Sequence, residues 1–280
     1  MKGRLLPWKA ASAAENMAVD ETIFYSYLQQ GAPGTLRFYR WRPPAVSIGC
    51  FQDYRQDIDR AACVKKGYEW VRRPTGGRAV LHEDEITYCL VAGEREGFSG
   101  SVLPDYLKVA EGFKEGFHLL GVKVDVAPGE RKNSDCSAAC FTAVSWYEIV
   151  TGGKKLVGSA QRRKKPAFMQ HGSILLRFHP ENLLAVLGRK AGPQQVGVLR
   201  QQVTCLEEIM GYRPEENKVI TALVEGLSRV LGISWAPGIL TPSEKKLARY
   251  IKENKYDNAG WNENPAKSWK SEGWEPEEKQ

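Results

Sequence analysis

The side chains best suited to covalent chemistry lie between residues 140 and 176, in CFTAVSWYEIVTGGKKLVGSAQRRKKPAFMQHGSILL. Cys140 opens this segment, and Lys154 and Lys155 follow a Gly-Gly pair. A thiol attacks only as the thiolate, and nearby cations lower its pKa from roughly 8.5. A lysine that loses its proton in a partly desolvated pocket could also act as a base and then as an acid. These residue types therefore indicate a nucleophilic thiol assisted by a lysine.

A hairpin is predicted to carry the lysines back toward the residues that precede the turn. Residues 145–150 and 155–160 have the composition of strands, and the Gly-Gly pair at 152–153 is a strong hairpin signal. A third apolar strand, at 173–176, follows the His-Gly pair at 171–172. Local sheet geometry can thus bring a cysteine and a lysine together.

Other chemistries fit the same residues less well. A lone cysteine is more often a small buried residue than a nucleophile. Cys136 and Cys140 lack the spacing of a zinc site, and Ala143 stands where an iron–sulfur pattern needs its third cysteine. Ser159 lies in Gly-Ser-Ala-Gln rather than in a Gly-x-Ser-x-Gly elbow, which disfavours a serine hydrolase. We therefore expect no metal site.

A second candidate site is RRPTGGRAVLHEDEITY, at residues 72–88. Pro74 and the Gly76–Gly77 pair predict a turn at which the backbone can approach a ligand closely. Three arginines surround this turn, and guanidinium groups beside exposed amides suit an anionic or carbonyl ligand. The pattern is neither a Walker A loop nor a dinucleotide fingerprint. For His82, as for His171, structural hydrogen bonding is at least as plausible as proton transfer.

Strands dominate the first two-thirds of the chain, with helices between and after them. Strands are predicted at 35–41, 45–49, 70–73, 78–82, 85–92 and 122–126, and helices at 14–28, 105–120, 180–187, 203–210, 214–231 and 243–255. On the first helix Met17 belongs to the apolar stripe, whereas Asp20 and Glu21 lie elsewhere on the wheel. This order predicts a single α/β (α+β) domain with a mixed β-sheet flanked by helices and a helical C-terminal portion. We expect the domain to span residues 1–255, with 256–280 a polar tail that is loosely ordered or packed on the surface.

The overall composition is that of a soluble globular protein. No apolar run approaches the roughly 20 residues of a membrane span, and the N-terminus lacks the apolar core of a secretory signal. Six scattered cysteines in a chain of 280 residues suit free thiols in a reducing compartment better than a disulfide framework. We therefore expect a cytoplasmic monomer without membrane association.

Positive charge is concentrated around the first candidate site. The chain has a formal net charge of +7, and residues 150–179 contain seven lysines and arginines without one acid. Such a run is often only a solvated face. It could also dock nucleic acid, a phosphate-bearing ligand or an acidic carrier protein. A nucleic-acid-binding module is disfavoured because no recognised nucleic-acid motif is present.

The two motif regions together resemble the lipoate/octanoate attachment family, which comprises lipoate–protein ligases, octanoyltransferases and, more distantly, biotin–protein ligases. Residues 72–88 resemble its Arg-Arg-x-Thr/Ser-Gly-Gly-x-Ala-Val-x-His signature. KKLVGSAQRR…QHGSIL resembles its Lys-hydrophobic-x-Gly-Ser-Ala segment and the His-Gly strand that follows, and AENMAVDE resembles its N-terminal helix. The resemblance covers roughly residues 10–250 and implies a biotin/lipoate-ligase-like fold.

Within that family the resemblance is to the octanoyltransferase branch. ATP-dependent ligases carry an Asn-Asp pair before the lysine, where this chain reads Ser-Trp-Tyr-Glu-Ile, and Arg78 replaces the third glycine of their Gly-Gly-Gly. By position the resemblance implies that Cys140 forms an octanoyl thioester and that Lys155, rather than Lys154, assists it. The implied donor is octanoyl-acyl carrier protein, and the implied acceptor is the glycine cleavage H protein or another lipoyl domain. No cofactor is implied beyond the phosphopantetheine of the donor.

The resemblance also implies substrate-binding residues drawn from both motifs. They are Arg72, Arg73, Thr75, Gly76, Gly77, Arg78, Ala79, His82, Tyr88, Gly158, Ser159, Ala160, His171 and Gly172. Val80, Leu81, Tyr88 and Val157 are candidates for an apolar slot around the eight-carbon tail, and the basic run 162–165 would meet the acidic carrier. Two alternatives stay open: an octanoyl amidotransferase that passes the group from H protein to E2 subunits, and an ATP-dependent lipoate–protein ligase.

Overall fold

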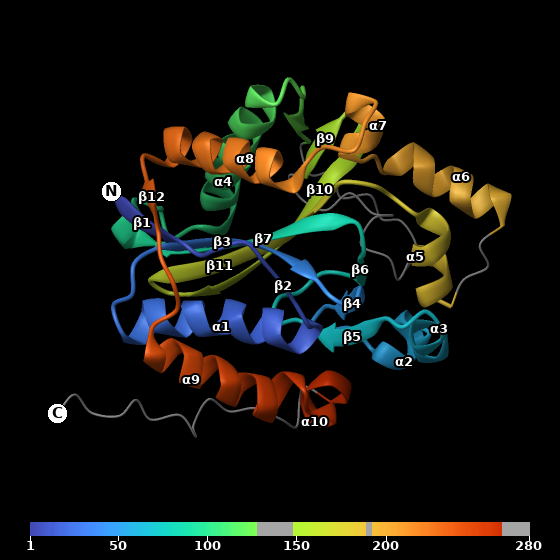
Figure 1. Cartoon of the computed structure of the whole chain (residues 1–280), viewed down its shortest axis with the longest axis horizontal. Coiled ribbons are helices and arrows are strands. Elements are labelled where there is room, and N and C mark those ends of the chain that lie inside the picture. Colours follow the sequence, from blue (N-terminus) through green and yellow to red (C-terminus); the bar gives the residue numbers. More distant parts are fainter. Residues whose placement is uncertain (128–147, 189–191, 265–280) are drawn as a thin grey trace.

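The computed structural model describes residues 1–127, 148–188 and 192–264, and two β-sheets organise them (Figure 1). The larger sheet is mixed and has the strand order β12-β1-β3-β7-β11-β10-β9-β8, with β2 paired to β3. Its strands are β1 (Lys2–Leu5), β2 (Lys9–Ala11), β3 (Thr35–Trp41), β7 (Glu85–Gly93), β8 (Asp125–Val126), β9 (Ile149–Thr151), β10 (Lys154–Lys164), β11 (Ala167–Leu175) and β12 (Ser234–Pro237). The smaller sheet has the order β5 (Glu69–Arg72), β4 (Ala45–Ile48), β6 (Val80–His82).

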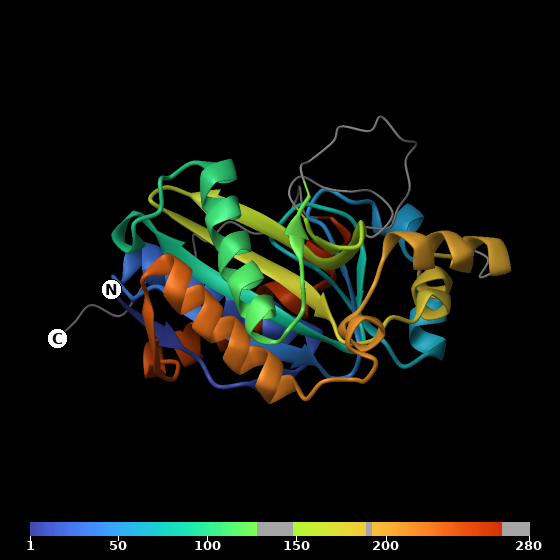
Figure 2. The ribbon, with the colours of Figure 1, turned by 90° about the horizontal axis from the view of Figure 1, so that it is seen from above.

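Helices cover both faces of the larger sheet. They are α1 (Ala13–Gln29), α2 (Tyr54–Asp57), α3 (Arg60–Lys65), α4 (Val102–Leu119), α5 (Pro180–Val186), α6 (Pro193–Gln202), α7 (Leu206–Met210), α8 (Glu216–Leu231), α9 (Pro242–Ile251) and α10 (Ala259–Glu263), with a 3₁₀ turn at Glu94–Glu96 and a π-helical turn at Lys252–Tyr256. Helices α4 and α8 pack side by side on one face, and α1 and α9 lie on the other (Figures 1 and 2). No helix in the described ranges is long and apolar enough to cross a membrane.

Strand β7 shows how the sheet is buried on both faces. Ile86, Tyr88 and Leu90 belong to the apolar cluster under α4 and α8, whereas Cys89 and Val91 belong to the cluster under α1 and α9. Successive side chains of a strand point to opposite faces, so a nearly continuous apolar sequence is expected when both faces are covered. The predicted mixed α/β class is thereby confirmed.

One local prediction is wrong and two features were not predicted, and contacts distant in sequence explain all three. Residues 203–210 do not form one helix: α6 ends before Val203, which is fully buried and pairs with Lys155 of β10. Strands β1 and β12 were not predicted, and they form by parallel pairing with each other, Lys2 opposite Ser234. Asp20 and Glu21, which lie away from the predicted apolar stripe of α1, are also fully buried.

The chain also stays packed beyond residue 255, where the sequence suggests that a polar tail begins. Tyr256 is 2% exposed and Asn262 is 8% exposed, while Trp261 packs against the apolar cluster under α1. The polar groups find partners inside: the Lys255 ammonium and the Tyr256 hydroxyl both donate to the Glu21 carboxylate. The described fold therefore extends through residue 264.

Candidate active site

The structure brings the two predicted motifs together at one cavity between the larger and smaller sheets. The turn at residues 73–78, called the glycine turn below, contributes Arg73 and Gly77, and β6 contributes His82. Strands β10 and β11 contribute residues 158–160 and 171–172. The antiparallel register of β10 and β11 sets Ala160 opposite His171, which places residues 158–160 beside residues 171–172. Residues about 90 positions apart in the chain thus line one cavity.

The apolar wall of the cavity comes mainly from residues that the sequence did not single out as ligand contacts. Met17 of α1 and Tyr39 and Trp41 of β3 line it, together with Val80. Polar side chains not predicted from the sequence also line it, namely Ser47, Thr87 and Ser173. The signal for Met17 was its place in the N-terminal helix motif. Of the candidates for an apolar slot, only Val80 lines this cavity, because Leu81, Tyr88 and Val157 lie in adjacent core clusters.

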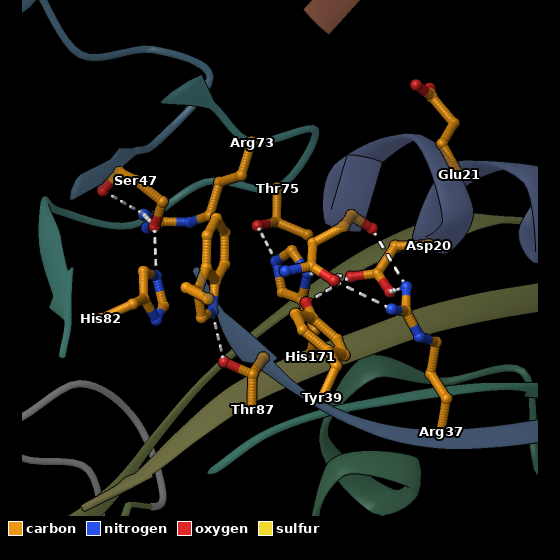
Figure 3. Close-up of polar contacts among 12 residues, drawn as sticks. Asp20, Glu21, Arg37, Tyr39, Ser47, Arg73, Thr75, His82, Thr87 and His171 are labelled. Atoms are coloured by element: carbon orange, nitrogen blue, oxygen red, sulfur yellow. Dashed lines mark hydrogen bonds and ion pairs between the residues drawn. The ribbon is translucent and has the colours of Figure 1, made fainter. Parts of the chain in front are cut away.

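His171 is the centre of a buried hydrogen-bonded chain (Figure 3). Its Nδ1 lies 3.1 Å from Asp20 Oδ2, and its Nε2 lies 2.7 Å from Thr75 Oγ1. The Asp20 carboxylate also accepts from Arg37 Nη1 at 2.8 Å and from the Tyr39 hydroxyl at 2.8 Å. The carboxylate is thus held by Arg37 and Tyr39 and orients the imidazole against the glycine turn.

His82 occupies a second buried chain on the other side of the cavity (Figure 3). Its Nε2 lies 2.8 Å from Ser47 Oγ and its Nδ1 lies 3.3 Å from Glu85 Oε1, while its ring stacks on Trp41 with centroids 4.1 Å apart. Burial lowers the pKa of His82 below its ordinary value, although Glu85 opposes this effect. The imidazole is therefore neutral near pH 7, and it can accept a hydrogen bond from Ser47.

The glycine turn is shaped from inside by Arg73. Its Nη1 donates to the carbonyl oxygen of Ser47 at 3.1 Å, and its Nη2 donates to the carbonyl oxygens of Gly76 at 2.7 Å and Arg78 at 2.8 Å. Gly77 has φ +92° and its neighbour across the turn is Gly49, where an added Cβ would lie 2.0 Å from the Gly77 carbonyl oxygen. The turn therefore depends on two glycines that other residues cannot replace without movement.

Several predicted binding residues lie behind the cavity wall rather than on it. Thr75 reaches the cavity only through His171, and the Tyr88 hydroxyl lies 2.7 Å from Ser159 Oγ. Ala79 is fully buried in the core of the smaller sheet. Gly76 and Arg78 flank Gly77 without lining the cavity. These residues position the wall.

Arg72 is a clearer departure, because it does not line the cavity and its guanidinium donates to backbone carbonyl oxygens. Its Nε donates to the carbonyl oxygens of Trp261 at 3.2 Å and Asn262 at 3.0 Å, and its Nη1 donates to those of Gly49 at 3.0 Å and Gln52 at 2.7 Å. The residue is 1% exposed. Burying a guanidinium requires such partners, so Arg72 supports the loops beside the cavity instead of meeting a ligand.

Of the two predicted catalytic residues, Lys155 lies within the described residues and Cys140 does not. Lys155 is 3% exposed, and its ammonium forms an ion pair with the carboxylate of Glu148. Cys140 lies outside the described residues, so its distance from Lys155 stays a prediction. The cysteines of the described ranges are free thiols, as expected, and Cys50 at the glycine turn is the half-buried one among them.

The basic run is not a continuous free surface. Arg162 pairs with the buried Glu21 at 2.8 Å, and Arg163 pairs with the buried Asp105. Only residues 164–165 of this run are exposed. The predicted solvated or docking face is therefore partly used in internal ion pairs between β10 and the helices that cover the sheet.

Solved structures share this fold. A lipoate protein ligase from Thermoplasma acidophilum, described as bi-partite and studied with its E2 lipoyl domain, aligns with a TM-score of 0.79 and 26% identity over 96% of this chain and 99% of that chain. A lipoate-protein ligase A bound with ATP aligns with a TM-score of 0.78 and 27% identity over 94% of this chain and 99% of that chain. The fold and the site thus define a catalytic domain of the lipoate-ligase class.

Sequence comparison identifies the family within this class. Residues 12–228 match the lipoyl protein ligase A/B catalytic domain, and the chain belongs to this family. Octanoyltransferase LipM of Moorella thermoacetica is 40% identical over 264 residues, covering 92% of this chain and 96% of that protein. Octanoyltransferase LipM of Kyrpidia tusciae is 41% identical over 268 residues, covering 92% and 97%.

Proposed function

We propose that this chain is an octanoyltransferase that moves the octanoyl group of octanoyl-acyl carrier protein to the lipoyl-domain lysine of the glycine cleavage H protein, early in protein lipoylation. The observation that carries the proposal is a cavity with an apolar wall that ends at the polar groups of both motifs. Relatives at 40–41% identity over nearly their whole length are named octanoyltransferases, which favours this reaction over ligation.

The cavity suits an acyl tail next to a reacting carbonyl group. Met17, Trp41 and Val80 offer apolar contacts, and each buried CH₂ contributes roughly 0.8 kcal/mol. Ser159 and His171 lie where the two motifs meet and are candidates to orient the carbonyl end. Backbone N–H groups near Gly77 and Gly158 are candidates to stabilise the oxyanion that forms when the carbonyl is attacked.

The reaction needs two acyl exchanges. The Cys140 thiolate attacks the carbonyl carbon of the donor thioester, a new C–S bond forms as the C–S bond to pantetheine breaks, and the pantetheine sulfur takes up the proton that the Cys140 thiol gave up. The acceptor lysine then attacks the acyl-enzyme as a neutral amine, a C–N bond forms, and the Cys140 thiol is released. The first exchange is nearly isoenergetic and the second is downhill because a thioester becomes an amide. ATP is therefore not required.

Lys155 is the proposed assistant of Cys140. Its ion pair with Glu148 holds the ammonium at a defined place in the interior. Positive charge near a thiol raises the fraction of thiolate, so stabilising the Cys140 thiolate is the first role proposed for the Lys155 ammonium. Proton transfer from the acceptor amine through Lys155 is the second proposed role.

Intact-mass measurement tests the proposal directly. The full chain is incubated with octanoyl-acyl carrier protein, and one octanoyl adduct is expected on the wild type and on Cys50→Ser but not on Cys140→Ser. Full transferase activity in Cys140→Ser would overturn the assignment of the nucleophile. Activity only with free octanoate and ATP would make the chain a ligase, and preference for octanoyl-H protein as donor would make it an amidotransferase.

A further inference from the structure

An exposed aromatic ring stands at the mouth of the cavity, and the reaction above gives it no role. Phe51 is 93% exposed, more than any other large apolar side chain that the structure describes. Its ring lies against the glycine turn, because a Cβ added to Gly76 would be 3.9 Å from Phe51 Cδ2. Gly77, the next residue, is exposed and lines the cavity. The ring is therefore beside the entrance rather than inside it.

The backbone that carries Phe51 is held on both sides. Arg72 Nη1 donates to the carbonyl oxygens of Gly49, Cys50 and Gln52 at 3.0, 3.3 and 2.7 Å. The Cys50 N–H donates to the Thr75 carbonyl oxygen at 2.9 Å. The exposure of the ring is thus built into a fixed loop and does not come from loose packing.

Residues near the C-terminal end of the described fold also hold Arg72, and through it the loop that carries Phe51. Trp261 and Asn262 offer their carbonyl oxygens to Arg72 Nε, and Trp261 Nε1 donates to the Arg72 carbonyl oxygen at 2.8 Å. A rigid aromatic side chain loses little conformational entropy when it binds, and exposed aromatic residues are enriched among the anchors of protein interfaces. The loop therefore has the properties of a preformed contact point.

We propose that Phe51 is the docking anchor for the domain that presents the acceptor lysine, an inference that rests on the proposed function. The acceptor amine ends a four-carbon side chain, so the surface of its domain must come against the cavity mouth before the amine can reach the acyl group. The phosphopantetheine arm of the donor is much longer, and its carrier can remain farther away. A ring directly at the mouth therefore meets the acceptor domain.

Charge at the mouth favours an acceptor with acidic residues around its lysine. Cys50, the neighbour of Phe51, lies within electrostatic range of Arg73 and Arg162. The side chain of Arg162 is 35% exposed, and it shares the Glu21 carboxylate with Lys255, so these three groups keep one net positive charge. Such a field steers an acidic surface toward the mouth, and the apolar ring supplies a contact that is less sensitive to salt.

Separating the two half-reactions tests the anchor. The acyl-enzyme is formed on the full chain with octanoyl-acyl carrier protein and separated from the carrier, and its discharge is followed by intact mass with two acceptors. One is recombinant H protein, and the other is hydroxylamine, a small nucleophile that needs no docking. Phe51→Ala is compared with Phe51→Tyr and with Tyr212→Ala, which removes an aromatic side chain that is 60% exposed outside the cavity.

We expect Phe51→Ala to slow discharge to subsaturating H protein about tenfold or more, while its discharge to hydroxylamine stays at the wild-type rate. Phe51→Tyr and Tyr212→Ala should match the wild type with both acceptors. Equal slowing with both acceptors, or no slowing with either, overturns the anchor. A wild type that forms no acyl-enzyme overturns the proposed function and, with it, this inference.

Discussion

Arg72 and Asn262 lie 190 residues apart and are joined by two hydrogen bonds. The Arg72 backbone N–H donates to Asn262 Oδ1 at 2.9 Å, and Arg72 Nε donates to the Asn262 carbonyl oxygen at 3.0 Å. Because the same guanidinium holds the carbonyl oxygens of Gly49 and Gln52, helix α10 is connected to the loop beside the cavity. The last described residues thus belong to the framework of the site.

Asn262→Ala should destabilise the fold. The substitution leaves the buried N–H of Arg72 without the Asn262 acceptor, and we expect the free energy of unfolding to fall by about 1–3 kcal/mol. Urea unfolding measures the change. Asn254→Ala on the preceding turn is the control, because that side chain is exposed, and equal losses in both variants would contradict the supporting role of Asn262.

Glu21 should make stability depend on acid pH. Burial alone would raise its pKa, but the charges of Lys255 and Arg162 and the hydrogen bond from Tyr256 outweigh burial, so the pKa lies below the ordinary 4.5. A depressed pKa means that the folded state favours the charged carboxylate. The stabilisation is therefore complete above pH 4.5 and is lost as the pH falls through the lower pKa of the folded state.

Comparison with Glu21→Gln isolates this contribution. At pH 7 the variant should be less stable by about 3–5 kcal/mol, because the Lys255 ammonium stays buried without a carboxylate partner. The difference from wild type should shrink as the pH falls below 4.5. Thermal unfolding at a series of pH values measures it, with the exposed Glu253→Gln as control. A difference that stays constant down to pH 2.5 would exclude Glu21 as the titrating group.

Lys155→Met should suppress the proposed acyl transfer by about 100-fold or more, the usual size of a lost acid–base group. Lys154→Met is the matched control, since Lys154 is half-buried and its side chain lies on the opposite face of β10 from that of Lys155. The rate of octanoyl adduct formation is the measurement. The double variant Lys155→Met/Glu148→Gln removes the uncompensated carboxylate, and recovery of the rate in that variant would show that Lys155 has only a structural role.

Two glycines at the cavity should respond differently to alanine. At Gly49 the new methyl group would lie 2.0 Å from the Gly77 carbonyl oxygen, which forces the glycine turn to move. At Gly76 the nearest atom is a Phe51 ring carbon at 3.9 Å, an ordinary contact. We expect Gly49→Ala to lower the melting temperature by several degrees and reduce acylation, and Gly76→Ala to keep both. Similar behaviour of the two variants would refute the close approach.

Sequence patterns were sufficient for the parts of the fold that depend on neighbouring residues. Strand β7 follows from its nearly continuous apolar run and helix α4 from helical spacing, and the two motifs that meet at the cavity follow from their residue types. Strands β1 and β12 were missed because each is short and because they pair with each other across more than 200 residues, with β1 also pairing with β3.

The sequence by itself determined the mixed α/β class, the family and the two motifs, because side-chain periodicity and motif composition are local properties. Only the tertiary structure decided that Arg72 supports loops instead of a ligand, that Glu21 is buried among cations, and that Lys155 is paired with Glu148. The physical reason is that burial and pairing are set by groups far apart in the chain. A charged residue in a sequence looks the same whether its partner is water or a buried opposite charge.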